Sequence, residues 1–96
     1  MYNYEFVVWL EGYLDVCKND ILTIKKLRVI RNHLNLVKVA EKDGLGSLNL
    51  EIYDLISHHI DAQSDEQTLQ KFKIELYDRL EAFLIESFPN GKQGRI

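Results

Sequence analysis

The sequence predicts an all-α protein, either a three- or four-helix bundle or a set of paired helical hairpins. Apolar residues recur at three- and four-residue spacing through most of the chain, and short polar or glycine-containing segments separate these stretches. Of the 96 residues, 46% are hydrophobic and 28% are charged, the composition of a folded globular domain. We expect a single helical domain over residues 1–88 and a flexible C-terminal tail over residues 89–96.

The first helix is expected from about Tyr4 to Lys18, with Asn3 as its N-cap. Its apolar residues form two adjacent seams: Phe6, Trp9, Tyr13 and Val16, and beside them Val7, Leu10, Leu14 and Cys17. Gly12 lies at the border of the first seam, next to Val16. A glycine inside a helix costs about 1 kcal/mol relative to alanine. We therefore expect a neighbouring helix, a second subunit or a ligand to approach Gly12 closely.

The second helix is expected over residues 24–40, after an N-cap at Thr23. Its core stripe has amphipathic spacing and consists of Leu27, Ile30, Leu34 and Val37. A second apolar stripe consists of Val29, Leu36 and Ala40. His33 lies between the two stripes, where it is either buried with a hydrogen-bond partner or lines a cavity between helices.

Each of the two remaining helices follows a clear break or start signal in the sequence. Two glycines in the segment EKDGLGS (residues 41–47) mark the strongest break, and a third helix is expected over residues 48–60. The last helix is expected over residues 65–87, because Ser64 and Gln67 have the spacing of a capping box.

Several of these helices carry more apolar surface than one intramolecular layer uses. The main stripe of the last helix consists of Leu69, Phe72, Leu76, Leu80 and Phe83. Ile74 and Ile85, however, lie on nearly the opposite side of that helix. Apolar faces without a partner inside the chain are typical of subunit interfaces, so we expect a homo-oligomer.

The charge of the chain excludes some classes of partner. A net charge of −3 provides no general attraction to duplex nucleic acid. No apolar run is long enough for a membrane span, and no signal-peptide pattern follows Met1. A single cysteine fits a reducing cytoplasm. We therefore expect neither duplex nucleic acid nor a membrane as a partner.

Metal-binding and catalytic patterns are missing from the sequence. Cys17, His33, His58 and His59 show none of the pair spacings of zinc sites. Cys17 lies on an apolar seam, so we expect a buried, inert thiol. We expect His59 in the core and His58 in solvent. No nucleophile motif or phosphate loop is present, and we expect a protein that is not an enzyme and needs no cofactor.

The strongest chemical signal is a stripe of positive side chains on the second helix. It consists of Arg28, Arg31, Asn35 and Lys38, which fall within an arc of about 80°. Guanidinium forks, an ammonium group and an amide suit phosphate or carboxylate groups. No acidic residue occurs between residues 24 and 40.

Three interpretations of this stripe are open. In an oligomer it could hold the phosphates of a nucleotide while Trp9 or Tyr13 stacks on the base. It could instead dock on an acidic protein surface. In the third interpretation it has no partner outside the chain, and it either pairs with Glu51 and Asp54 or faces water.

The first 40 residues resemble a group of small phage-encoded proteins of uncharacterised function. The opening FVVWLEGYLD has the pattern F-x-x-W-L-x-G-[YF]-[LF]-[DE], and residues 30–37 have the pattern I-x-x-H-L-x-x-V. The matching residues are Phe6, Trp9, Leu10, Gly12, Tyr13, Leu14, Asp15, Ile30, His33, Leu34 and Val37. The resemblance implies a phage origin. Small phage proteins without catalytic motifs commonly bind a host molecule.

Together these features predict a non-catalytic phage protein in the host cell cytoplasm. It would counter host defence by sequestering a small phosphate-bearing nucleotide signal in a helical oligomer. The predicted ligand-binding residues are Arg28, Arg31, Asn35, Lys38, Trp9, Tyr13 and His33. The alternatives are an inhibitor or adaptor that docks on a host protein and a structural or assembly protein of the phage.

Overall fold

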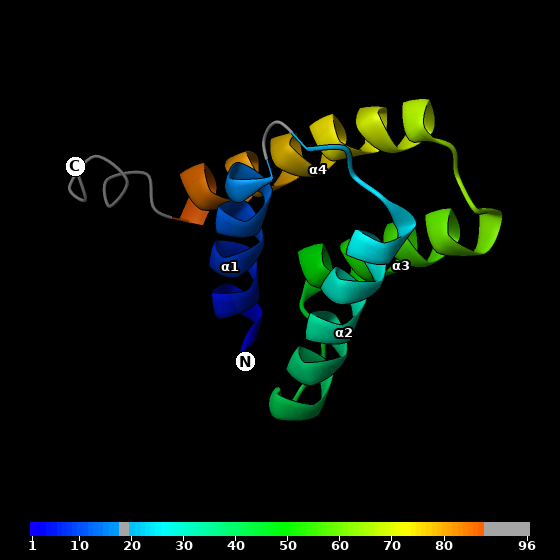
Figure 1. Cartoon of the computed structure of the whole chain (residues 1–96). Coiled ribbons are helices and arrows are strands. Elements are labelled where there is room, and N and C mark those ends of the chain that lie inside the picture. Colours follow the sequence, from blue (N-terminus) through cyan, green and yellow to red (C-terminus); the bar gives the residue numbers. More distant parts are fainter. Residues whose placement is uncertain (18–19, 88–96) are drawn as a thin grey trace.

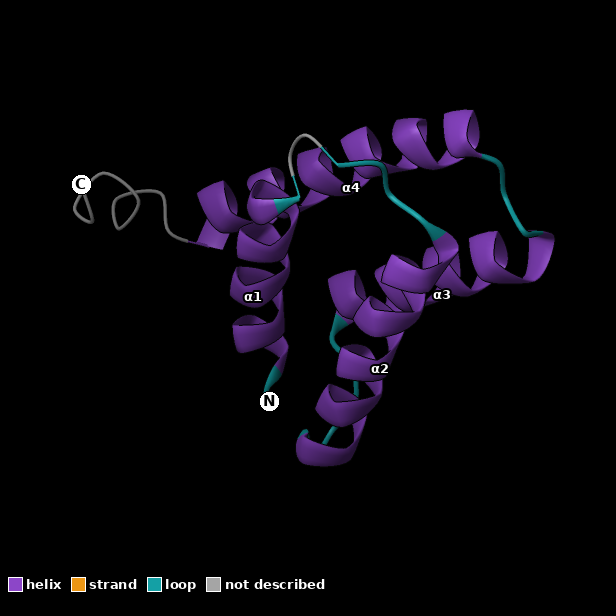
Figure 2. Ribbon diagram, in the orientation of Figure 1, coloured by secondary structure: helices purple, strands orange, loops and turns teal. Residues whose placement is uncertain are grey.

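The structure is a computed structural model that describes residues 1–17 and 20–87. Within these residues it contains four helices and no strand (Figure 1, Figure 2), which confirms the all-α prediction. The helices are α1 (Asn3–Val16), α2 (Ile24–Ala40), α3 (Ser47–Ala62) and α4 (Glu66–Ser87). The predicted end of the first helix at Lys18 and the predicted tail over 89–96 lie outside the described residues. None of the described helices combines the length and the apolar character that a membrane span requires.

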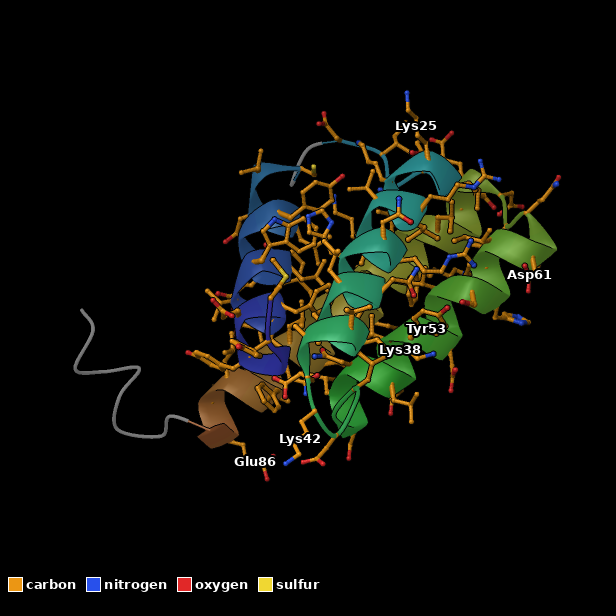
Figure 3. All side chains as sticks on the ribbon, turned by 90° about the horizontal axis from the view of Figure 1, so that it is seen from below. Lys25, Lys38, Lys42, Tyr53, Asp61 and Glu86 are labelled. Atoms are coloured by element: carbon orange, nitrogen blue, oxygen red, sulfur yellow. The ribbon has the colours of Figure 1, made fainter. Side chains whose placement is uncertain are left out.

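Helix α2 lies between α1 and α3. Figure 3 shows the three helices in that order, and α2 contacts both of its neighbours. Residues 41–46 join α2 and α3 as an antiparallel pair, and α4 packs against α1 and α3. In Figure 1, α4 runs across the top of the molecule. Because α2 is the middle helix, its two flanks face different neighbours.

The core forms where the predicted stripes of the four helices meet. The fully or nearly fully buried residues of α1 and α2 are Phe6, Val7, Leu10, Leu14, Leu27, Ile30, Leu34 and Val37. From α3 and α4 the core receives Ile52, Ile56, Ile60, Leu69, Phe72, Leu76, Leu80 and Leu84. The predicted core stripe of α2 is therefore confirmed.

Several predicted apolar positions lie outside this core. Val16 is 85% exposed, although it continues the first seam of α1. Val29 and Leu36 are 37% and 58% exposed, so the second stripe of α2 has no partner among the described residues. Cys17 is only half-buried, and the prediction of a buried thiol there is wrong. It is the C-cap residue that follows the last turn of α1.

The N-terminus of α1 is fixed by contacts that are distant in sequence. The N-cap is Tyr2, not Asn3, and its backbone N–H donates to the Glu5 carboxylate at 2.9 Å. The Asn3 side chain is used elsewhere: Nδ2 donates to the Gly44 carbonyl at 3.1 Å, and Oδ1 accepts from Gly46 N–H at 3.0 Å. Asn3 therefore ties α1 to the α2–α3 loop. That loop turns at Gly44, whose φ of +80° favours glycine.

The N-caps of α2 and α4 differ in how well the sequence predicts them. Thr23 caps α2 and accepts from Lys26 N–H at 3.2 Å, which confirms the prediction. The predicted cap of α4 at Ser64 is wrong, because Asp65 accepts from Thr68 N–H at 2.8 Å. This hydrogen bond lowers the pKa of Asp65. Ser64 is occupied elsewhere, since its hydroxyl lies 2.8 Å from Nδ1 of His59.

A buried lysine fastens the end of α1 to α4. Lys73 is only 8% exposed, and its Nζ donates to the carbonyl oxygens of Cys17 at 2.7 Å and Asp20 at 3.0 Å. Carbonyl groups at a helix C-terminus lack intrahelical partners and attract positive charge. Lys73 therefore positions the connection from which α2 starts.

Candidate functional site

A stack of rings lies between α1 and α2. The Trp9 ring stacks on His33 with centroids 4.0 Å apart and on Tyr13 with centroids 5.1 Å apart, in both cases nearly parallel. Phe6 packs against the same indole at 5.8 Å from inside the core. Trp9, Tyr13 and His33 are all half-buried. The structure thus brings together three of the predicted binding residues, but Trp9 is already engaged by neighbouring rings.

Hydrogen bonding and burial fix the protonation of this ring stack. His33 Nδ1 lies 2.9 Å from the Val29 carbonyl oxygen. A carbonyl can only accept, so Nδ1 carries the proton in the neutral ring and Nε2 is left as an acceptor. Burial, with a smaller contribution from Cys17, raises the pKa of Tyr13. The Tyr13 hydroxyl therefore stays protonated at neutral pH.

The positive stripe of α2 faces away from this ring stack. Arg28, Asn35 and Lys38 are exposed, and Arg31 is half-buried. At about 100° per residue, each of these four side chains lies about 140–160° around the helix axis from His33. The stripe therefore lies on the flank of α2 next to α3, while the rings lie on the flank next to α1. In a single chain, Trp9 and Tyr13 cannot stack on a ligand that these cations hold.

The cations of this stripe have no acidic partner inside the described part of the chain. The two ion pairs among residues 1–17 and 20–87 are Lys26 with Asp20, at 3.9 Å, and Arg79 with Glu51. Glu51, which the sequence offered as a partner of the stripe, is therefore paired with α4 instead. Arg28, Arg31 and Lys38 extend along about 15 Å of helix without an ion pair to a described residue.

An aromatic residue that the sequence analysis missed borders the stripe. Tyr53 of α3 is half-buried at the edge of the core. It lies about 160° around the α3 axis from Glu51 and about 120° from His59. Those two residues contact Arg79 and Phe72 of α4, so Tyr53 is on the side of α3 that faces α2.

The level of Tyr53 along the hairpin matches the middle of the stripe. Tyr53 comes six residues after α3 begins, and Leu34 comes six residues before α2 ends. In an antiparallel pair these two positions lie level, so Asn35 is beside Tyr53 with Arg31 and Lys38 on either side. Figure 3 shows Lys38 and Tyr53 at neighbouring points of α2 and α3. No sequence signal distinguishes Tyr53 from an ordinary core-edge aromatic residue.

Two hollows on the surface lie away from both flanks of α2. One, of about 310 Å³, is lined by Asn3, Val7, Gly46, Ser47, Leu48, Asn49 and Phe83. The other, of about 340 Å³, is lined by Gln70, Lys73, Ile74, Tyr77 and Asp78. Neither contains a predicted binding residue. Burial and the hydrogen bond to Asp15 raise the pKa of Tyr77 to about 12, so this hydroxyl is a donor and not a base.

His58 of α3 lies in solvent, as the sequence predicts, whereas His59 lies at the edge of the core and not inside it. His59 is half-buried against Phe72, with ring centroids 4.4 Å apart, and His58 is exposed. Burial lowers the pKa of His59, and the neighbouring His58 lowers it further. Among the described residues, no group of three His, Cys, Asp or Glu side chains is arranged to hold a metal ion.

Comparisons with known proteins add no assignment to this geometry. No protein-family model, no curated protein and no solved structure matches the chain. The candidate site is the α2–α3 flank, which we define as Arg28, Arg31, Asn35, Lys38 and Tyr53.

Proposed function

We propose that this protein is a non-catalytic binding protein that sequesters a small phosphate-bearing nucleotide on its α2–α3 flank. The observation that carries the proposal is a row of positive side chains without acidic partners in the described chain, next to a half-buried tyrosine. Guanidinium groups bind phosphate oxygens in pairs, and an aromatic ring accepts a base by stacking. This flank offers both within a single chain.

Each side chain of the flank has a distinct role in this proposal. Arg28, Arg31 and Lys38 hold the phosphates, since they lie on one side of the helix, with axial separations of about 4.5 Å from Arg28 to Arg31 and about 10.5 Å from Arg31 to Lys38. Asn35 provides a donor and an acceptor at the level of Tyr53, which stacks on the base. These five residues include no histidine, cysteine or carboxylate, and on this proposal they bind the ligand without cleaving it.

The resemblance of the first 40 residues to small phage proteins supports a role in the host cell. A phage protein that binds a signalling nucleotide without cleaving it lowers the free concentration of the signal. On this proposal the ligand belongs to a host defence response, and the protein acts in the host cytoplasm. Trp9, Tyr13 and His33, which the sequence also suggested as binding residues, have a structural role here.

The apolar surroundings of the flank favour one alternative. Val39 is 86% exposed and Leu50 is 50% exposed, and both border the positive stripe. Exposed apolar side chains beside cations are also suited to docking on an acidic protein surface. In that case the protein is an inhibitor or adaptor of a host protein, and the same stripe is its docking face.

Thermal unfolding with a panel of cyclic mononucleotides, cyclic dinucleotides and ADP-ribose tests the proposal. A ligand at 100 times its dissociation constant adds about 2.7 kcal/mol to the free energy of unfolding, which raises the melting temperature by about 10–20 °C. We expect at least one member to do so. No shift with any member would contradict the proposal and favour a protein partner.

A matched pair of lysine variants tests the site. Lys38→Gln should reduce the ligand-induced shift, whereas Lys25→Gln removes an exposed lysine about 140° around α2 and should not. After heat denaturation the ligand should be recovered intact. Recovery of a cleaved product would show an enzyme instead.

A further inference from the structure

We propose that a hollow at the end of the molecule where α1 and α3 begin is a second binding site, for a small apolar carboxylic acid that carries a hydroxyl group beside its carboxylate. The hollow has a volume of about 310 Å³. In Figure 3 this end of the molecule carries Lys42, in the loop before α3, and Glu86, near the end of α4. The hollow is separate from the α2–α3 flank, so this proposal does not depend on the proposed nucleotide.

The hollow is mostly apolar and has a few polar groups at its floor. The starts of α1 and α3 supply Val7, Leu48 and Asn49, and the last turns of α4 supply Phe83. Val7 and Asn49 are 1% and 2% exposed and form the floor. Leu48 and Phe83 are half-buried and form apolar walls. Apolar walls with a small number of placed polar groups are typical of small-molecule sites.

The amide of Asn49 leaves one polar atom at this floor without a partner. Its Nδ2 donates to the Asn3 backbone carbonyl at 3.1 Å and to Asn3 Oδ1 at 2.9 Å. The Asn3 amide is itself fixed, because its Nδ2 donates to the Gly44 carbonyl and its Oδ1 accepts from Gly46 N–H. Asn49 therefore faces two acceptors on Asn3, and only its NH₂ group can serve them.

The remaining atom of that amide, Asn49 Oδ1, is an acceptor that lacks a donor. It is buried and has no hydrogen-bond partner among the described residues. A buried acceptor without a donor is costly, and most such groups in proteins are paired. The atom is closed to solvent, so a ligand hydroxyl reaches it as the half-buried wall of the hollow shifts. The hydroxyl then supplies the missing donor.

The start of α3 supplies donors beside this acceptor. The N-cap of α3 is Gly46, which has no side chain to accept from the first turn, and that turn contains no acid. The backbone N–H groups of Ser47, Leu48 and Asn49 have no acceptor among the described residues. N–H groups in the first turn of a helix lack partners within the helix and attract negative charge.

The carboxylates that lie nearest in the described chain serve α1 and not α3. Glu5 accepts from Tyr2 N–H at 2.9 Å, and Glu41 accepts from Asn3 N–H at 2.9 Å. Both therefore bind backbone donors at the start of α1. A carboxylate from outside the chain would give the start of α3 the acceptor that α1 already has.

These groups together define the chemistry of the ligand. A carboxylate accepts from the first turn of α3, a hydroxyl on the adjacent carbon donates to Asn49 Oδ1, and an apolar body packs against Leu48 and Phe83. An ammonium group in place of the hydroxyl would be repelled by the positive start of α3, which favours a hydroxy acid over an amino acid. Phenyllactate has all three parts and is the probe.

NMR titration of the full chain with phenyllactate, up to ~20 mM, tests the site. A ligand of this size is expected to bind with a dissociation constant on the order of 1 mM. We expect the backbone amide signals of Ser47, Leu48 and Asn49 to move most. No binding at any concentration, or movement concentrated on the α2–α3 flank, would overturn the proposal.

Two analogues of the probe separate the polar contacts. Hydrocinnamate lacks the hydroxyl, and phenyllactamide keeps the hydroxyl but replaces the carboxylate with a neutral amide. Each should bind at least ~5-fold more weakly than phenyllactate. Equal affinity for either analogue would overturn the proposal. The ligand is varied here because a substitution of Asn49 also removes its two hydrogen bonds to Asn3.

A matched pair of variants tests the start of α3. Ser47→Asp places a carboxylate at an exposed position in the first turn, where it accepts from the same N–H groups and repels the ligand. It should weaken phenyllactate binding at least ~10-fold without lowering the melting temperature. His58→Asp makes the same change in charge at an exposed position about 16 Å further along α3 and should leave the affinity unchanged. Unchanged affinity in Ser47→Asp would overturn the proposal.

Discussion

The two flanks of α2 differ in their chemical character and in the helix that each of them faces. Toward α1 the flank is apolar: His33 stacks on Trp9, and Val29 and Leu36 extend the surface. Toward α3 it is positive, with Arg31 and Lys38 on either side of the level of Tyr53. The core stripe separates them. A helix in the middle of a small bundle can therefore present two different surfaces, one on each side of its buried stripe.

The cations of the two flanks also differ in their partners. Lys26, on the α1 side, donates to the Ile21 carbonyl at 2.9 Å and pairs with Asp20. Its charge stabilises the chain's own turn. Arg28 and Lys38, on the α3 side, form no ion pair among the described residues. Charges without a partner inside the chain are the ones available to a ligand.

The largest expected effect comes from the core stripe that separates the flanks. Leu34 is completely buried, so Leu34→Ala should lower the free energy of unfolding by about 3 kcal/mol through lost burial and the cavity left behind. Chemical denaturation measures this loss. A change below about 1 kcal/mol would mean that α2 is not held by this stripe.

Truncation of one aromatic residue on each flank should show the next largest difference. Trp9→Ala removes ring contacts to Phe6, Tyr13 and His33 and should cost about 2 kcal/mol of stability. Tyr53→Ala should cost about 1 kcal/mol, since Tyr53 packs only at the edge of the core. Equal costs in chemical denaturation would contradict the division into a structural and a binding flank.

Gly12 lies on the α1 side of the ring stack and tests whether the single chain needs a glycine there. Gly12→Ala should raise the free energy of unfolding by about 1 kcal/mol, because alanine is the better helix former and the site is open. Thermal or chemical unfolding measures this gain. Destabilisation would mean that the fold requires the glycine.

The smallest expected effect is a pH dependence that involves neither flank. Burial lowers the pKa of His59 below its ordinary value of 6.5, so the folded state favours the neutral ring. The stability that the neutral His59 ring contributes is complete above pH 6.5. It is lost as the pH falls from 6.5 toward the pKa of His59 in the folded state. Unfolding at about pH 7.5 and about pH 5.5 should show the loss. His59→Gln should reduce it, and His58→Gln, at an exposed position, should not abolish it.

Local patterns predicted α2 best, because its signals are local. Thr23 caps it through a contact three residues away, and the bounds Ile24–Ala40 agree with the structure. Asn3 looked like a cap by the same criterion, but its side chain is used by Gly44 and Gly46 about 40 residues later. A single helix pattern contains no information about such contacts. The Ser64 cap failed for a related reason, since the nearby His59 binds its hydroxyl.

The candidate site was predicted only in part. The positive stripe of α2 follows from its period alone. Which aromatic residue accompanies it depends on the order in which the helices pack, and that order places α3, not α1, beside the stripe. Only the structure therefore identifies Tyr53 as the aromatic residue beside the stripe. The sequence predicted Trp9 and His33 as ligand-binding residues, whereas in the structure they stack on each other between α1 and α2.

The measurement that tests the central claim most directly compares two tyrosines on the two flanks of α2. The member of the nucleotide panel that most raises the melting temperature of the wild type is added to Tyr53→Ala and to Tyr13→Ala, each compared with its own ligand-free melting temperature. We predict that the ligand-induced shift is lost or strongly reduced in Tyr53→Ala and kept in Tyr13→Ala. A shift kept in Tyr53→Ala and lost in Tyr13→Ala would place the ligand on the α1 flank and contradict the account.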